Sequence, residues 1–189
     1  MLPLADQRPH KLYLLGMGCM VLAWFMACAE IGVNTHLWVS GLSEQGYRQA
    51  WSDEMPGLLS EAYAMSSGSR LLLMLLDYAP VLISVLGLIL TGLFFRRLAK
   101  GELWTRRNAS TLVYIGLLSI LELLLQPVLS TLEGLVLSMN LPEGERVLSV
   151  SVGFSSEAAY TLVKAIFLCS FGLIMGEARK LDEEVKSII

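Results

Sequence analysis

The chain has 189 residues, of which 54% are hydrophobic and 16% are charged, and its net charge is −3 at pH 7. Soluble domains carry about 25% charged residues, so this composition is typical of a membrane protein. The slight acidity argues against direct nucleic-acid binding, which requires a strongly basic surface. The three cysteines form no CxxC pair and the two histidines are isolated, so no metal or cofactor site is predicted.

Four apolar runs are long enough to cross a bilayer as helices, and they lie at residues 12–33, 71–95, 111–137 and 158–175. The first run corresponds to about 33 Å of helix, against a hydrocarbon core of ~30 Å. A cleaved signal peptide is the competing interpretation of that run, but the apolar part of such a peptide has only about 7–15 residues. We therefore expect an all-α membrane protein in which residues 1–189 form one domain with four transmembrane helices.

Two polar segments, residues 34–70 and 138–157, join the first run to the second and the third run to the fourth. Residues 42–51 predict a short amphipathic helix capped by Ser43, and residues 58–65 favour another. Residues 147–152 alternate apolar and polar side chains, which is typical of a strand, and a partner near residues 37–39 would complete a short β-hairpin. We expect a small cap with aromatic anchors at the membrane interface: Trp38, Tyr47, Trp51 and Tyr63.

A basic turn, residues 96–110, joins the second run to the third. Gly101 is expected to end the preceding helix and Thr105 to cap the next one. Three cations accompany the polar segments, whereas ten accompany the turn, the beginning of the chain and the tail at residues 176–189: Arg8, Lys11, Arg96, Arg97, Lys100, Arg106, Arg107, Arg179, Lys180 and Lys186. The positive-inside rule then places both termini and the turn in the cytoplasm, and both polar segments outside.

Polar side chains inside the predicted spans form a candidate intramembrane site. In the third span they recur at spacings of 3, 4, 4 and 3 residues, so they share one helical face: Ser119, Glu122, Gln126, Ser130 and Glu133. Glu30, Asp77 and Lys164 lie near the outer ends of the other spans, and we expect the lysine to offset the carboxylates. The site therefore comprises Glu30, Asp77, Glu122, Gln126, Glu133 and Lys164. Hydrogen bonding that merely joins the helices is one competing interpretation. An outward-facing aqueous vestibule without a specific ligand is the other.

The basic turn is a second candidate site, formed by Arg96, Arg97, Lys100, Arg106 and Arg107. Anionic lipid headgroups or a cytoplasmic protein partner would suit such a cluster. The chain contains no GxSxG, HExxH or P-loop motif, and nothing supplies a base to a nucleophile. We therefore expect that the protein is not an enzyme.

Several short motifs resemble one bacterial membrane family. They are Phe94-Phe95, Gly101-Glu102-Leu103-Trp104-Thr105, Asn108, Leu112, Ile115-Gly116, the alternating residues 147–152, and the ending from Glu177 to Ile189. The family is catalogued as domain of unknown function 2975. The resemblance implies four spans in the bacterial inner membrane and a partner such as a small helix-turn-helix regulator.

Three hypotheses for function follow from these patterns. The first is a non-enzymatic membrane protein that senses or sequesters a cytoplasmic partner, either alone or as a homo-oligomer. The second is a small transporter, or an accessory subunit of one, with a proton or cation path along Glu122, Gln126 and Glu133. The third is a purely structural assembly subunit.

Overall fold

The computed structural model describes residues 10–61, 63–102, 104–147 and 156–188, which form five α-helices and one short 3-10 helix. In chain order these are α1 (His10–Val39), α2 (Leu42–Ala50), η1 (Pro56–Leu59), α3 (Ser67–Ala99), α4 (Arg106–Ser138) and α5 (Ser156–Ile188). Within the described ranges no residue belongs to a strand. The predicted all-α fold is confirmed for this part of the chain.

Four of the helices, α1, α3, α4 and α5, are long and apolar enough to cross a membrane. They coincide with the four predicted runs and extend beyond each run at both ends. The extension arises because an apolar run reports only the hydrocarbon core, whereas a helix continues until its backbone is capped or broken. The difference is greatest in α5, which continues through the charged tail to Ile188.

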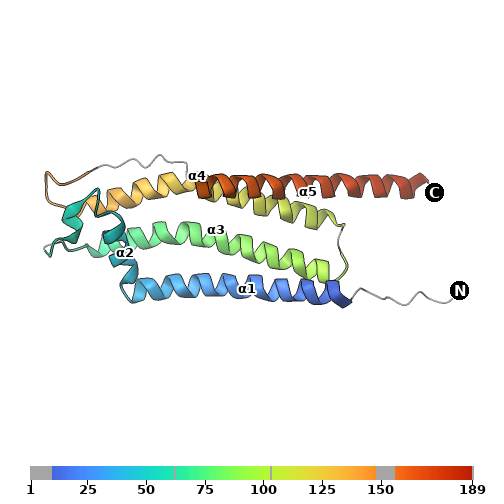
Figure 1. The fold of residues 1–189 in the computed structure, drawn as a ribbon, viewed down its shortest axis with the longest axis horizontal. Coiled ribbons are helices and arrows are strands. Elements are labelled where there is room, and N and C mark those ends of the chain that lie inside the picture. Colours follow the sequence, from blue (N-terminus) through green and yellow to red (C-terminus); the bar gives the residue numbers. More distant parts are fainter. Residues whose placement is uncertain (1–9, 62, 103, 148–155, 189) are drawn as a thin grey trace.

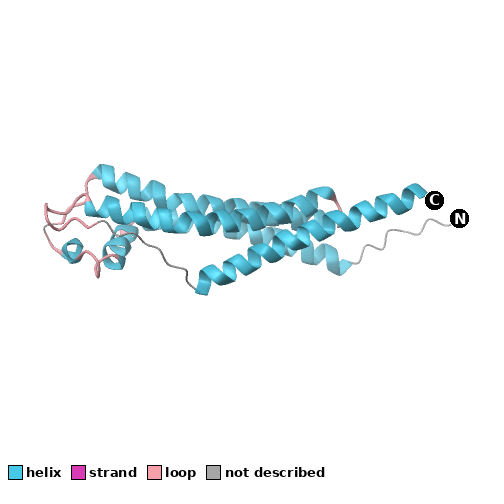
Figure 2. Cartoon of the chain, turned by 90° about the horizontal axis from the view of Figure 1, so that it is seen from above, coloured by secondary structure: helices cyan, strands magenta, loops and turns pink. Residues whose placement is uncertain are grey.

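The long helices lie side by side in chain order, so that α1 packs on α3, α3 on α4, and α4 on α5 (Figure 1). Seen from above, α5, which ends at the C label, runs obliquely to the other long helices (Figure 2). α1 and α5 occupy the two edges of the row, and no comparable packing joins them among the described residues. The four long helices therefore form an open row.

The two ends of the row differ in character. The cap, residues 40–66, lies at one end with α2 and η1, and the connection between α3 and α4 lies at the other (Figure 1). α1 begins beside that connection, and α5 extends past it. We call these the cap end and the turn end.

The connection at the turn end is six residues long, from 100 to 105, and it has the predicted stop and start signals. Gly101 has a φ of +80°, a left-handed conformation that glycine adopts without steric cost. The Thr105 hydroxyl accepts a hydrogen bond of 3.2 Å from the backbone N–H of Asn108, which caps α4. Both predictions are confirmed, and the fully buried Asn108 amide also donates to the carbonyl of Glu102.

The cap has a packed core of its own. Trp38, Trp51 and Tyr63 are only 3%, 9% and 8% exposed. They pack with apolar side chains from the cap, from α3, from the end of α4 and from the segment that follows α4: Met55, Leu58, Leu73, Val136, Leu137 and Leu141. This packing buries the large aromatic rings inside the protein. These three aromatics are therefore core side chains rather than the interface anchors that we expected.

Three local predictions in the cap and beside it are wrong. α2 begins after Gly41, which has no side chain to cap it, so Ser43 is not the cap. The helix expected over residues 58–65 is reduced to η1, because the backbone becomes extended at Ser60. Residues 37–39 belong to α1 and cannot form half of a β-hairpin. Most of the predicted partner strand, residues 148–152, lies outside the described residues.

Candidate functional site

A carboxyl group of α3 organises the polar contacts at the cap end. Asp77 accepts hydrogen bonds from Asn34 Nδ2 at 3.0 Å and from Trp38 Nε1 at 2.6 Å, both on its Oδ2 atom. The two donors lie one turn apart on α1, so a single face of that helix supplies both. A third bond, of 3.0 Å, reaches Asp77 Oδ1 from the hydroxyl of Tyr47 on α2.

The Tyr47 hydroxyl contacts two carboxyl groups from different helices. Besides Asp77 it lies 3.2 Å from Oε1 of Glu133 on α4. A hydroxyl has one proton to donate, so the two carboxyl groups compete for it. Burial raises the pKa of Tyr47, and the nearby carboxylates of Glu133 and Asp77 raise it further. Tyr47 therefore keeps its proton and joins α2, α3 and α4.

A second pair of carboxyl groups lies deeper along the helices. Ser84 on α3 donates a hydrogen bond of 3.1 Å to Oε2 of Glu30 on α1. Glu30 also lies near enough to Glu122 on α4 to interact with it electrostatically. Side chains from α1, α3 and α4 thus come together at two levels along the helices, around Asp77 and around Glu30. The carboxyl groups at each level come from segments that are far apart in the sequence.

A cavity of about 350 Å³ lies between α3 and α4. Its lining contains four of the five polar residues predicted on one face of the third span, together with apolar residues and a proline: Pro80, Ile83, Glu122, Leu125, Gln126, Leu129, Ser130 and Glu133. The fifth, Ser119, is not among them, and its hydroxyl donates to the carbonyl of Ile115 at 3.2 Å. The cavity is the place where a small polar ligand would meet these side chains.

No family model, no curated protein and no solved structure matches the chain. The candidate site is therefore assessed from its own geometry. Among the described residues, no group of three or more His, Cys, Asp or Glu side chains is arranged to hold a metal ion.

Lys164 is not brought to the carboxylates. Its side chain is exposed on α5, and no ion pair joins it to Glu30, Asp77 or Glu133 in the described part of the chain. Tyr47, Trp38 and Asn34 provide hydrogen-bond donors where we expected an ammonium group. The prediction rested on how far along its span Lys164 lies. That position does not specify which face of α5 turns toward α4, so it could not predict the contacts of the lysine.

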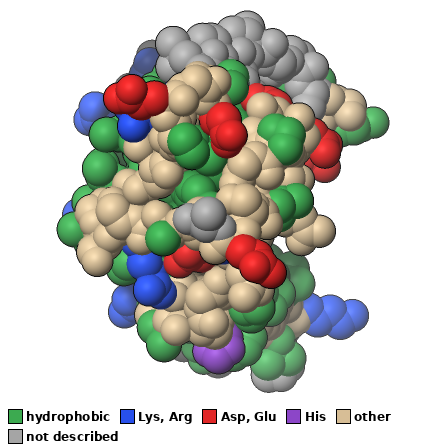
Figure 3. Space-filling model, turned by 90° about the vertical axis from the view of Figure 1, so that its left-hand side faces the viewer, with side chains coloured by type: hydrophobic (Ala, Val, Ile, Leu, Met, Phe, Trp, Pro, Cys, Tyr) green, Lys and Arg blue, Asp and Glu red, His purple; other side chains and the backbone are tan. Residues whose placement is uncertain are grey.

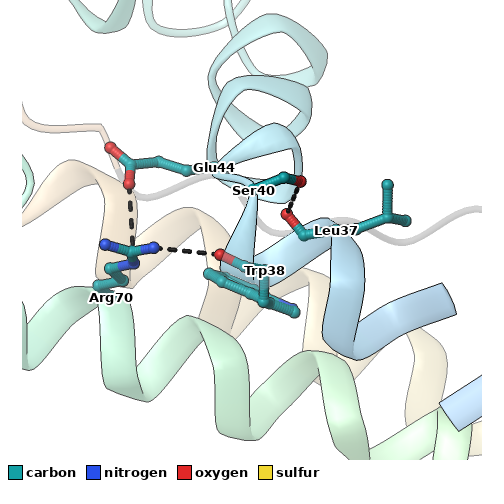
Figure 4. Close-up of polar contacts among 5 residues, drawn as sticks. All are labelled: Leu37, Trp38, Ser40, Glu44 and Arg70. Atoms are coloured by element: carbon teal, nitrogen blue, oxygen red, sulfur yellow. Dashed lines mark hydrogen bonds and ion pairs between the residues drawn. The ribbon is translucent and has the colours of Figure 1, made fainter. Parts of the chain in front are cut away.

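An arginine holds the cap against the long helices. Arg70 Nη2 on α3 donates a hydrogen bond of 3.1 Å to the carbonyl of Trp38, and its Nε lies 3.9 Å from Oε2 of Glu44 on α2 (Figure 4). Seen along the row, the cap end presents several acidic side chains between apolar ones (Figure 3). Arg70 thus joins the end of α1 to the cap near the Asp77 contacts.

The five cations of the basic turn lie at the turn end, but they are not equally exposed. Arg96, Lys100, Arg106 and Arg107 are exposed. Arg97 is half-buried, because its Nη1 atom donates to Thr111 Oγ1 at 3.0 Å. The structure therefore separates a cation that holds α3 to α4 from four that face outward.

Sequence analysis did not include the hydrogen-bond donors of the cap end in the site. Glu30, Asn34 and Trp38 are spaced by four residues, and this spacing places them on one face of a helix. That signal could have brought Trp38 into the site. Tyr47 had no comparable signal, because its contacts depend on how α2 folds back over α3 and α4.

Proposed function

We propose that the protein is a non-enzymatic, multi-pass protein of the bacterial inner membrane that senses a small cationic ligand at the cap end and binds or sequesters a cytoplasmic partner at the turn end. The excess of cations beside the turn supports the orientation. The resemblance described above supports the bacterial membrane and a partner such as a small helix-turn-helix regulator.

The observation that carries this proposal is the position of Tyr47 beside the cavity. Its hydroxyl contacts Glu133, and Glu133 also lines the cavity. A cation bound there would compete with Tyr47 for the carboxyl group, and so would change how the cap is attached to α4. Because α4 is one helix from Arg106 to Ser138, it is the element through which such a change would reach the turn.

The partner-binding surface in this proposal consists of Arg96, Lys100 and Arg107, which are exposed at the turn end. Three cations on one short stretch would complement a partner that presents an acidic surface. Arg97 is left out because it bonds to Thr111.

The double variant Arg96→Glu, Lys100→Glu should lower recovery of the partner by about ten-fold or more, because like charges across an interface are strongly unfavourable. The measurement is affinity purification of the tagged protein from its native host in mild detergent, with mass spectrometry of the proteins recovered. The expected partner is a small DNA-binding protein.

The control is Arg146→Glu, which makes the same kind of charge change at an exposed position of the cap end. It should leave recovery unchanged. Reporter fusions must show that the orientation of the double variant is unaltered. Equal recovery from the double variant and the unaltered protein would refute the partner site.

A second function, a proton or cation path, is favoured by the length of the cavity. Its lining runs from Glu133 to Glu122 on α4. These residues are eleven positions apart, or about 16 Å along a helix. We propose as the alternative that a small transporter, or its accessory subunit, moves a cation along Glu122, Gln126 and Glu133.

Under this alternative, Glu122→Gln should reduce proton or cation flux into liposomes by about ten-fold or more, because it removes the carboxyl group at the end of the path that lies farthest from the cap. Flux is measured with a pH-sensitive or cation-sensitive dye inside the vesicles. The control Glu61→Gln changes an exposed carboxyl of the cap and should have no effect. Unchanged flux in Glu122→Gln would eliminate the path and leave the sensing function.

A further inference from the structure

Two hollows flank the first turns of α4 at the turn end. One, of about 620 Å³, lies between α4 and α5. The other, of about 690 Å³, lies between α4, the connection and the end of α3. Both are lined by Arg106, Ser110, Tyr114 and Arg179, so they adjoin one another along these side chains.

The hollow between α4 and α5 is apolar on its inner side. Ala109, Val113 and Leu173 line it, and Gly176 leaves space where other residues have a side chain. A Cβ atom on Gly176 would meet Ala109 only at 3.9 Å, so the site is open there. Leu173 is 63% exposed, which means that the hollow continues onto the apolar surface of the row.

The rim of the two hollows is cationic. Among the described residues that line them, five are cations and two are carboxylates, Glu102 and Glu177. Lys180 Nζ lies 2.7 Å from Glu177 Oε1, so the opposite charges of these two side chains largely cancel. Arg106 is exposed and lines both hollows, which makes it the central cation of the rim.

Aromatic side chains indicate that the hollows lie at the height of the membrane interface. Tyr114 lines both hollows and is 59% exposed. Trp104, in the connection, is 57% exposed. Tyrosine and tryptophan are enriched where hydrocarbon gives way to lipid headgroups.

We infer that the joined hollows bind an anionic phospholipid with two phosphate groups, of the diphosphatidylglycerol type. Each hollow would hold one phosphate, with Arg106 between them, and acyl chains would follow the apolar surface beside Leu173. Cationic pockets between transmembrane helices suit such headgroups. The inference requires the four long helices to lie in a membrane. It shares Arg107 with the proposed partner-binding surface but uses neither Arg96 nor Lys100.

The first test is a titration of delipidated protein in mild detergent with diphosphatidylglycerol, followed by native mass spectrometry. The unaltered protein should bind one molecule preferentially. Arg106→Gln should weaken binding by about five-fold or more, because a cation near the surface contributes about that factor. Arg96→Gln, an exposed cation at the same end that lines neither hollow, should stay within about two-fold of the unaltered protein. Equal weakening by both variants would show attraction to net charge alone and would overturn the site.

A second variant tests the apolar part without removing a charge. Gly176→Leu should fill the inner side of the hollow between α4 and α5 and weaken lipid binding by about five-fold or more, with the circular dichroism spectrum unchanged. Binding as tight as that of the unaltered protein would overturn the inference.

Two competitors identify the ligand class. Pyrophosphate, which lacks acyl chains, and phosphatidylglycerol, which has one phosphate, should both compete only weakly with diphosphatidylglycerol. If pyrophosphate competed as well as diphosphatidylglycerol, the ligand would be a soluble anion instead. If phosphatidylglycerol did so, the site would bind a headgroup with one phosphate.

Discussion

Replacing Asp77 with alanine should lower the free energy of unfolding by about 2–4 kcal/mol. The reason is that Asn34 and Trp38 lose their acceptor on Asp77, and Tyr47 keeps only Glu133. A polar group left without a partner away from water costs more than the hydrogen bond itself contributed. The measurement is reversible unfolding in mixed detergent micelles, followed by tryptophan fluorescence and circular dichroism.

The control for this prediction is Asp53→Ala, which removes an exposed aspartate from the cap. We expect an effect within about 0.5 kcal/mol, as for most surface substitutions. The loss of unfolding free energy in Asp77→Asn should lie between those of Asp77→Ala and Asp53→Ala, because an amide oxygen can still accept some of the hydrogen bonds. If Asp77→Ala were no more destabilising than Asp53→Ala, Asp77 would not organise the cap end.

Replacing Gly172 with alanine should destabilise the protein by about 1–3 kcal/mol, although alanine is the better helix former. A Cβ atom at this position would lie 2.7 Å from the backbone oxygen of Ala109 and 2.8 Å from Val113 Cγ2. Since α4 would have to move away from α5, packing outweighs helix propensity. The same unfolding assay gives the free energy.

Gly18→Ala provides the matched control for that substitution. Nothing lies within 4 Å of the added methyl group on α1, so only helix propensity remains. The variant should be neutral or more stable by up to about 1 kcal/mol. The two substitutions therefore have opposite expected signs. A stabilising effect at Gly172 would contradict the close approach of α4 and α5.

The positions of the long helices could be predicted because hydrophobicity along a chain directly reports which segments belong in a membrane. The beginning of α4 could also be predicted, since Thr105 acts through its own local backbone. The cap was less predictable. Trp51 and Tyr63 are equally suited to an interface and to a core, and only the folding of residues 40–66 over α3 and α4 decides between them.

The candidate site shows the same division. The spacing from Glu122 to Glu133 places its polar side chains on one face whatever lies beside α4, and the cavity confirms that shared face. The partners of Asp77 depend instead on the rotation of α1 and on the docking of α2, which spacing within a helix does not specify. Lys164 was misplaced for the same reason.

The order of helices in the row affects how the chain can assemble during synthesis. Each of α3, α4 and α5 packs on the long helix that precedes it in the chain. A newly inserted helix therefore finds its neighbour already in the membrane and need not wait for a later segment, unlike the last helix of a closed ring, which must also meet the first. Assembly can proceed stepwise from the first synthesised residues, with mostly local contacts formed at each step.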